Sequence, residues 1–100
     1  MRLTSHQIST VLTVSHRIAG TEAEVRLFGS RLDDSRRGGD LDLLIITPHR
    51  MSRLQRAELK ESLEEALSMP VDILNYVQDS PPTPFQAIAL AQAHSLDDAA

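Results

Sequence analysis

The segment DLDLLII, residues 40–46, carries the strongest structural signal in this chain of 100 residues. Most of it is an apolar run, which is typical of a strand buried in the middle of a sheet. The segment nevertheless begins with Asp40 and Asp42, although aspartate is depleted in strands. Stability alone does not explain two carboxylates at the start of such a strand. The segment therefore predicts a central strand whose first residues serve a chemical purpose.

The sequence around this strand alternates between helical and extended patterns. Thr4 with Gln7 and Ser52 with Gln55 form the capping-box pattern of helix starts, and Pro84 suits the first position of a last helix. We expect helices over residues 4–20, 52–69 and 83–94, and strands over residues 24–28, 40–46 and 71–77. This order predicts a single domain over residues 1–100 of the α/β (α+β) class, a small mixed β-sheet of three or more strands with helices packed on it. Residues 95–100 are expected to form a frayed tail.

The composition is that of a globular protein, with 41% apolar and 24% charged residues. The sequence contains no cysteine, which excludes a disulfide framework and a thiolate metal site and fits a reducing compartment. The apolar runs are too short to span a bilayer, and the N-terminus lacks the apolar core of a signal peptide. We therefore expect a cytoplasmic protein that does not act at a membrane.

The charge pattern argues against nucleic acid as a partner. The net charge is −4, and the chain has only three aromatic residues with which to stack bases. Nearly all of the basic residues are arginine, and three of them, Arg31, Arg36 and Arg37, lie between two predicted strands. Such a cluster either binds a small, strongly anionic ligand or solvates a loop, and the roles of Arg36 and Arg37 stay open.

Three aspartates on two predicted strands form the candidate site. Asp40 and Asp42 point to the same face of their strand, because side chains two residues apart lie on one side at roughly 6.5–7 Å. Asp72 interrupts the apolar strand 71–77 in the same way and would face the same site if that strand lies next to strand 40–46. Like charges on one face repel each other unless a cation lies between them. Carboxylates at this spacing suit magnesium, including sites that hold two ions about 3.5–4 Å apart.

Gly29 and Ser30 follow the strand 24–28 directly. A glycine after a strand lets the backbone approach a ligand closely, and the next turn can present N–H groups to an anion. A Gly-Ser pair is also a common turn, so its meaning depends on the aspartates that follow it after a gap of nine residues.

Taken together, LFGS, nine residues, DLDLL and the later VDIL resemble the motif of the nucleotidyltransferase superfamily typified by DNA polymerase β. Within it the chain most resembles the minimal nucleotidyltransferases, small antitoxin-like proteins of bacteria and archaea. The resemblance implies a polymerase β-like core in which Asp40 and Asp42 bind two Mg²⁺ ions. It also implies that Asp72 helps to bind the catalytic metal and activates the incoming hydroxyl.

For the loop, the resemblance implies that Gly29 and Ser30 hold the β and γ phosphates of a nucleoside triphosphate. Arg31 matches a basic residue that is common in these proteins. Asp33 stands where the family often carries an arginine, a departure that concerns the loop and not the three carboxylates.

The function that the resemblance implies is transfer of AMP from ATP, or of another nucleoside monophosphate, to a hydroxyl. The implied acceptor is a tyrosine of a HEPN-domain toxin, which makes the chain an antitoxin. Two alternatives stay open: a non-catalytic antitoxin that binds its partner and keeps a vestigial nucleotide site, and an aminoglycoside-type nucleotidyltransferase. The sequence determines neither the base of the nucleotide nor whether the chain forms a homo- or hetero-oligomer.

Overall fold

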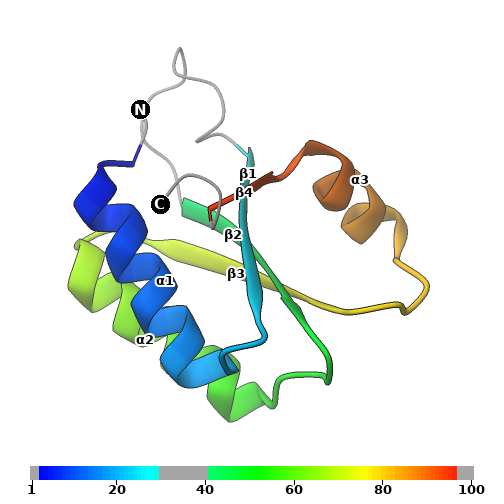
Figure 1. Ribbon diagram of the computed structural model, residues 1–100, viewed down its shortest axis with the longest axis horizontal. Coiled ribbons are helices and arrows are strands. Elements are labelled where there is room, and N and C mark those ends of the chain that lie inside the picture. Colours follow the sequence, from blue (N-terminus) through cyan, green and yellow to red (C-terminus); the bar gives the residue numbers. More distant parts are fainter. Residues whose placement is uncertain (1–2, 30–40, 97–100) are drawn as a thin grey trace.

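The computed structural model describes residues 3–29 and 41–96 of the chain, and these form three helices and one four-stranded sheet (Figure 1). The elements follow one another in the order α1 (Ser5–Ala19), β1 (Glu24–Phe28), β2 (Leu41–Thr47), α2 (Arg53–Leu67), β3 (Val71–Val77), α3 (Pro84–Gln92) and β4 (His94–Ser95). The predicted order of helices and strands is therefore confirmed, with one additional short strand at the end. No helix among these described residues is long and apolar enough to cross a membrane.

The sheet is mixed, with the strand order β3-β2-β1-β4. β1 is antiparallel to both β2 and β4, whereas β2 and β3 are parallel and joined through α2. β2 lies in the interior of the sheet, as its apolar sequence predicts. Leu41 and the five consecutive residues from Leu43 to Thr47 are buried. The parallel pairing brings the first residues of β2 and β3 to the same end of the sheet.

Two layers of helices enclose the sheet. α1 and α2 lie side by side on one face, and α3 lies on the other (Figure 1). Side chains alternate between the faces along β2: Leu43 and Ile45 belong to the larger core under α1 and α2, and Leu44 and Ile46 to a smaller cluster with Ala89 of α3. The face under α3 is only partly covered, and this leaves room for a site.

All three helices begin with a reciprocal capping box. In α1, Gln7 N–H donates to Thr4 Oγ1 over 3.1 Å, and Thr4 N–H donates to Gln7 Oε1 over 2.8 Å. The predicted caps at Thr4 and Ser52 are confirmed, and Thr83 makes the same arrangement with Gln86. These caps satisfy N–H groups that have no partner within the helix and so define where each helix starts.

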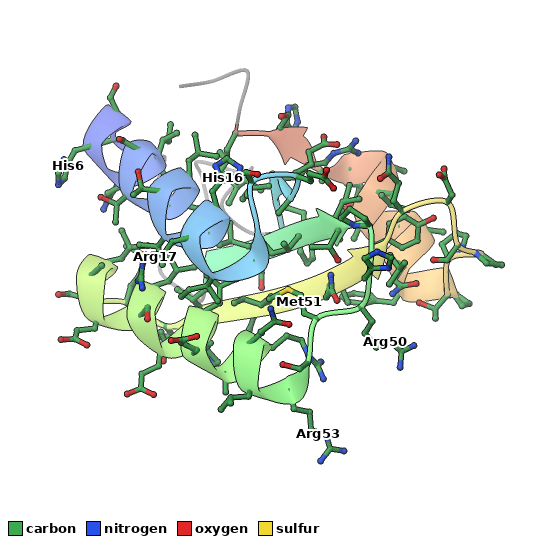
Figure 2. The ribbon with its side chains drawn as sticks, turned by 60° about the horizontal axis from the view of Figure 1, so that its bottom comes forward. His6, His16, Arg17, Arg50, Met51 and Arg53 are labelled. Atoms are coloured by element: carbon green, nitrogen blue, oxygen red, sulfur yellow. The ribbon has the colours of Figure 1, made fainter. Side chains whose placement is uncertain are left out.

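The turn between β2 and α2 is held by Asn75 of β3. Met51 N–H donates to Asn75 Oδ1 over 2.9 Å, and Asn75 Nδ2 donates to Ile45 O and Thr47 Oγ1, each over 3.0 Å. Met51 itself is buried, whereas its neighbours Arg50 and Arg53 point away from the protein (Figure 2). Asn75 thus links three segments at this end of the sheet, and the opposite end carries the aspartates.

The C-terminal segment differs from the prediction. The last helix ends at Gln92 and not at residue 94, and His94–Ser95 form β4 against β1. Leu96 N–H donates to Val25 O over 2.9 Å, and the Leu96 side chain is buried. Fraying from residue 95 is therefore wrong for residues 95 and 96, because the outer edge of β1 offers main-chain partners and the core accepts Leu96. Residues 97–100 lie outside the described part of the chain.

Candidate functional site

Asp42 and Asp72 are directly opposite each other on neighbouring strands. They are partners in the parallel register of β2 and β3, as are the preceding residues Leu41 and Val71, which are completely buried under α1 and α2. Because side chains alternate along a strand, burial of Leu41 and Val71 on one face turns both aspartates to the other face. The structure thus brings together two of the three predicted carboxylates. Asp40, the third, lies outside the described residues.

Gly29 packs against the carboxylate of Asp42. Its φ is +82°, a conformation that L side chains rarely adopt, and the preceding Phe28 is the register partner of Asp42. A Cβ at Gly29 would lie 2.2 Å from Asp42 Oδ2 and 2.9 Å from its Cγ. A side chain at this position would be strained by the positive φ and would displace the Asp42 carboxylate, so glycine here makes room for the Asp42 side chain. Ser30 and Arg31 lie outside the described residues.

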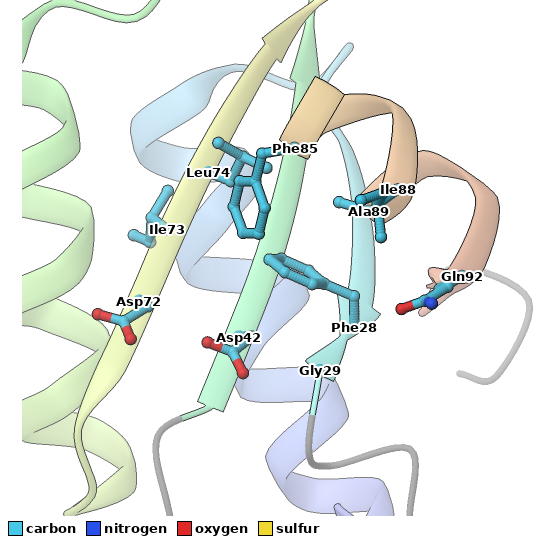
Figure 3. A pocket seen from close by; sticks show the side chains of 10 residues that line it. All are labelled: Phe28, Gly29, Asp42, Asp72, Ile73, Leu74, Phe85, Ile88, Ala89 and Gln92. Atoms are coloured by element: carbon cyan, nitrogen blue, oxygen red, sulfur yellow. The ribbon is translucent and has the colours of Figure 1, made fainter. Parts of the chain in front are cut away.

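Both aspartates border a cavity of about 450 Å³ on the α3 side of the sheet (Figure 3). Gly29 and the two carboxylates form one end, and the rest of the wall is mainly apolar. Phe28 and Phe85 meet edge to face there, with ring centroids 6.2 Å apart. Phe85 and Ile88 remain 59% and 55% exposed. The cavity suits a molecule that has a cationic or metal-bound end and a planar, less polar end.

Two charged residues of α2, Lys60 and Glu64, lie next to the first residues of β3. Lys60 Nζ lies 3.0 Å from Glu64 Oε2 and 3.9 Å from Asp72 Oδ1. Glu64 also accepts a hydrogen bond from Val71 N–H over 2.9 Å. That hydrogen bond, followed by the one from Lys60, lowers the pKa of the Glu64 carboxyl below its usual 4.5. Glu64 is therefore ionised at neutral pH.

The donor set fits magnesium. This ion is usually held by one or two carboxylates together with phosphate oxygens of a substrate. Asp42 and Asp72 supply two carboxylates that face one cavity, and the side chain of Asp72 is 58% exposed and so accessible. Residues 3–29 and 41–96 contain no group of three or more histidine, cysteine or acidic side chains arranged to hold a metal.

The apolar wall of the cavity was not foreseen from the sequence. For Phe28 the signal was available, because in β1 it alternates with the buried Val25 and Leu27 and so has to point to the face of Asp42. No comparable signal existed for Phe85 and Ile88, since α3 is apolar on more than one side. Lys60 and Glu64 have the i,i+4 spacing of an ordinary ion pair on a helix surface, which does not indicate a contact with β3.

The sequence matches one protein family. The family is described as Polymerase beta, Nucleotidyltransferase, and its model matches residues 20–96, a range that includes Gly29, Asp42 and Asp72. No curated protein matches the chain.

Several solved structures share the fold. One is a tri-AMPylated HEPN toxin of Shewanella oneidensis in complex with an MNT antitoxin, with a TM-score of 0.73, 20% identity, and coverage of 97% of this chain and 78% of that chain. A toxin–antitoxin structure with AMP-PNP has a TM-score of 0.75 and 21% identity, covering 89% of this chain and 71% of that one. The toxin–antitoxin MntA-HepT has a TM-score of 0.72 and 18% identity, covering 93% and 71%. At these identities the likeness shows a common fold.

Proposed function

Because the chain belongs to the Polymerase beta nucleotidyltransferase family, we propose that it transfers a nucleoside monophosphate, AMP from ATP, to a hydroxyl with the help of magnesium. The observation that carries this proposal is the direct pairing of Asp42 with Asp72 at the end of one cavity. Like charges placed opposite each other on a sheet repel, and a cation bound between the two carboxylates would relieve that repulsion.

In this proposal Asp40, Asp42 and Asp72 hold two magnesium ions, and Gly29, Ser30 and Arg31 lie along the triphosphate. The ions, when bound, neutralise charge on the phosphate, the attacking oxygen and the leaving oxygen. Asp72 takes the proton of the acceptor hydroxyl, a role that suits its exposed side chain. The hydroxyl oxygen bonds to the α-phosphorus, the bond from that phosphorus to the β-phosphate oxygen breaks, and pyrophosphate leaves.

The proposed acceptor is a tyrosine of a HEPN-domain toxin, which makes the chain an antitoxin that forms a hetero-oligomer with its target in the cytoplasm. Two observations support this part. A structure of the same fold contains an AMPylated HEPN toxin, and another contains an ATP analogue. In this chain the exposed Phe85 and Ile88 border the cavity next to the carboxylates, where the planar ring of a tyrosine would find apolar contacts.

The alternative is a non-catalytic antitoxin that acts by contact alone. The exposure of Phe85 and Ile88 favours a protein partner in either case, since apolar side chains at a protein surface are often covered in a complex. The placement of Asp42 and Asp72 side by side at one end of the cavity favours the enzyme.

Label transfer separates the two functions. The protein is incubated with magnesium, a HEPN-domain toxin, and ATP labelled either at the α or at the γ phosphate. We expect label on the toxin only from α-labelled ATP, and none with Asp72→Ala, which loses a metal ligand and the group that accepts the proton. If the wild type neutralises the toxin equally well without ATP, and a variant with all three aspartates replaced does the same, the non-catalytic function is correct.

A further inference from the structure

Lys60 and Glu64 together hold both main-chain groups of one residue, Val71. Glu64 Oε2 accepts the Val71 N–H over 2.9 Å, and Lys60 Nζ donates to the Val71 carbonyl oxygen. β3 is an edge strand of the described sheet, so main-chain groups on its outer side have no neighbouring strand to bind. The two side chains of α2 take the place of that strand at a single residue.

The residue that they hold is the one before Asp72. The Val71 carbonyl belongs to the peptide plane that leads into Asp72, so fixing this carbonyl restricts the direction of the Asp72 Cα–Cβ bond. The Val71 side chain is buried in the core under α1 and α2, which also fixes this residue. Lys60 Nζ also lies 3.9 Å from Asp72 Oδ1 and thus approaches the carboxylate itself.

We infer that Lys60 is a positioning residue for Asp72, and that Glu64 aligns Lys60 for this task. The inference rests on the proposed function, because it gives Lys60 a role only through Asp72. About half of the Lys60 side chain is exposed, and exposed ion pairs contribute little to stability. The arrangement therefore affects the geometry of the site much more than the stability of the protein.

The first test compares Lys60→Met, which keeps the aliphatic stem, with Lys60→Arg, which keeps a cation and N–H donors. We expect kcat to fall roughly 10–100-fold in Lys60→Met with little change in the KM for ATP, as for other residues that orient a metal ligand. Lys60→Arg should recover most of the loss. Arg53→Met is the matched control, because Arg53 lies on the same helix and points away from the protein (Figure 2). Melting temperatures of all three variants should stay close to that of the wild type.

The second test does not depend on turnover. Lys60 is the sole lysine in the sequence, so incorporation of lysine labelled with ¹³C at the ε position gives one side-chain signal. In the metal-free protein this signal should shift in both Asp72→Asn and Glu64→Gln. Addition of Mn²⁺ should broaden it in the wild type, because a paramagnetic ion bound by Asp72 would lie within a few ångströms, and Asp72→Asn should reduce the broadening.

The outcomes distinguish this inference from the proposed function. If the wild type transfers no label and Mn²⁺ leaves the Lys60 signal sharp, the proposed function fails. If the wild type is active but Lys60→Met matches Arg53→Met, the positioning role is refuted. If Lys60→Met does not fold, the Lys60 signal of Glu64→Gln and Asp72→Asn tests the positioning role instead. An unchanged signal in both variants would refute that role, and a shifted signal in both would support it.

Discussion

The contact between Gly29 and Asp42 gives the sharpest prediction. In Gly29→Ala the new Cβ would lie 2.2 Å from Asp42 Oδ2, and the backbone would have to keep a φ of +82°. Ordinary contact begins at 3.4 Å, so the carboxylate has to retreat by roughly 1.2 Å. The substitution thus moves a proposed metal ligand without removing it.

The size of the effect can be worked out for stability and for activity separately. The left-handed backbone costs an alanine about 1–2 kcal/mol, which in a domain of this size lowers the melting temperature by roughly 5–15 °C. Displacement of a reacting group by about 1 Å can slow a reaction on the order of 10²-fold. We therefore expect a moderately less stable protein with a large loss of kcat.

Gly20→Ala is the matched control. Gly20 also has a positive φ, +104°, but a Cβ there would meet nothing within 4 Å. This variant should lose stability to a similar degree and keep a kcat within about twofold of the wild type, because no site residue moves. The assays are thermal unfolding and transfer of label from α-labelled ATP.

A double variant tests the cause. Gly29→Ala combined with Asp42→Ala lacks the two closest clashing atoms, so it should be more stable than the sum of the single changes predicts. Additive stabilities, or a kcat of Gly29→Ala equal to that of Gly20→Ala, would refute the steric argument.

Three further predictions concern single side chains. Asp42→Asn should leave the metal-free protein as stable as the wild type or slightly more stable, since the substitution removes the repulsion between residue 42 and Asp72. The same variant should lose the rise in melting temperature that magnesium with ATP causes in the wild type. If the metal-free variant is unfolded, Asp42 has a structural role instead. The pKa of Glu64 is lowered in the folded protein, so the stability that this ionised carboxylate contributes is complete above the unfolded pKa near 4.5 and is lost as the pH falls through the lower folded pKa. The difference in unfolding free energy between the wild type and Glu64→Gln should therefore shrink over that pH range. A difference that stayed constant would refute this contribution of Glu64. The buried Ser15 hydroxyl has no hydrogen-bond partner among the described residues. Ser15→Ala should therefore stabilise the protein by about 1 kcal/mol and raise its melting temperature by several degrees. A lower melting temperature would indicate that the hydroxyl has a partner.

Much of this fold is visible in the sequence because its signals are local. The capping boxes at Thr4 and Ser52 mark helix starts, and the apolar run after Asp42 marks the central strand. The approach of Asp42 to Asp72 could be expected only if their strands were neighbours, and the parallel register makes them direct partners.

Other features depend on contacts between distant segments and leave no local pattern. His94 and Ser95 are ordinary residues for a helix end, and they form a strand only because the edge of β1 is available. Lys60 and Glu64 have the spacing of a surface ion pair, and their hydrogen bonds to Val71 follow from the position of α2 beside the edge of the sheet. The roles of Ser30, Arg31 and Asp40 fall outside the described residues and stay predictions.

The pairing of β4 with β1 has a consequence for the order in which the protein folds during synthesis. Leu27 pairs with His94, so the last strand finds its place on a strand translated roughly 70 residues earlier, a contact that forms slowly compared with local ones. Until then one edge of β1 is open to other chains, which is a known route to aggregation. A released chain that ended before His94 would contain both aspartate-bearing strands, β2 and β3, and yet expose this edge of β1.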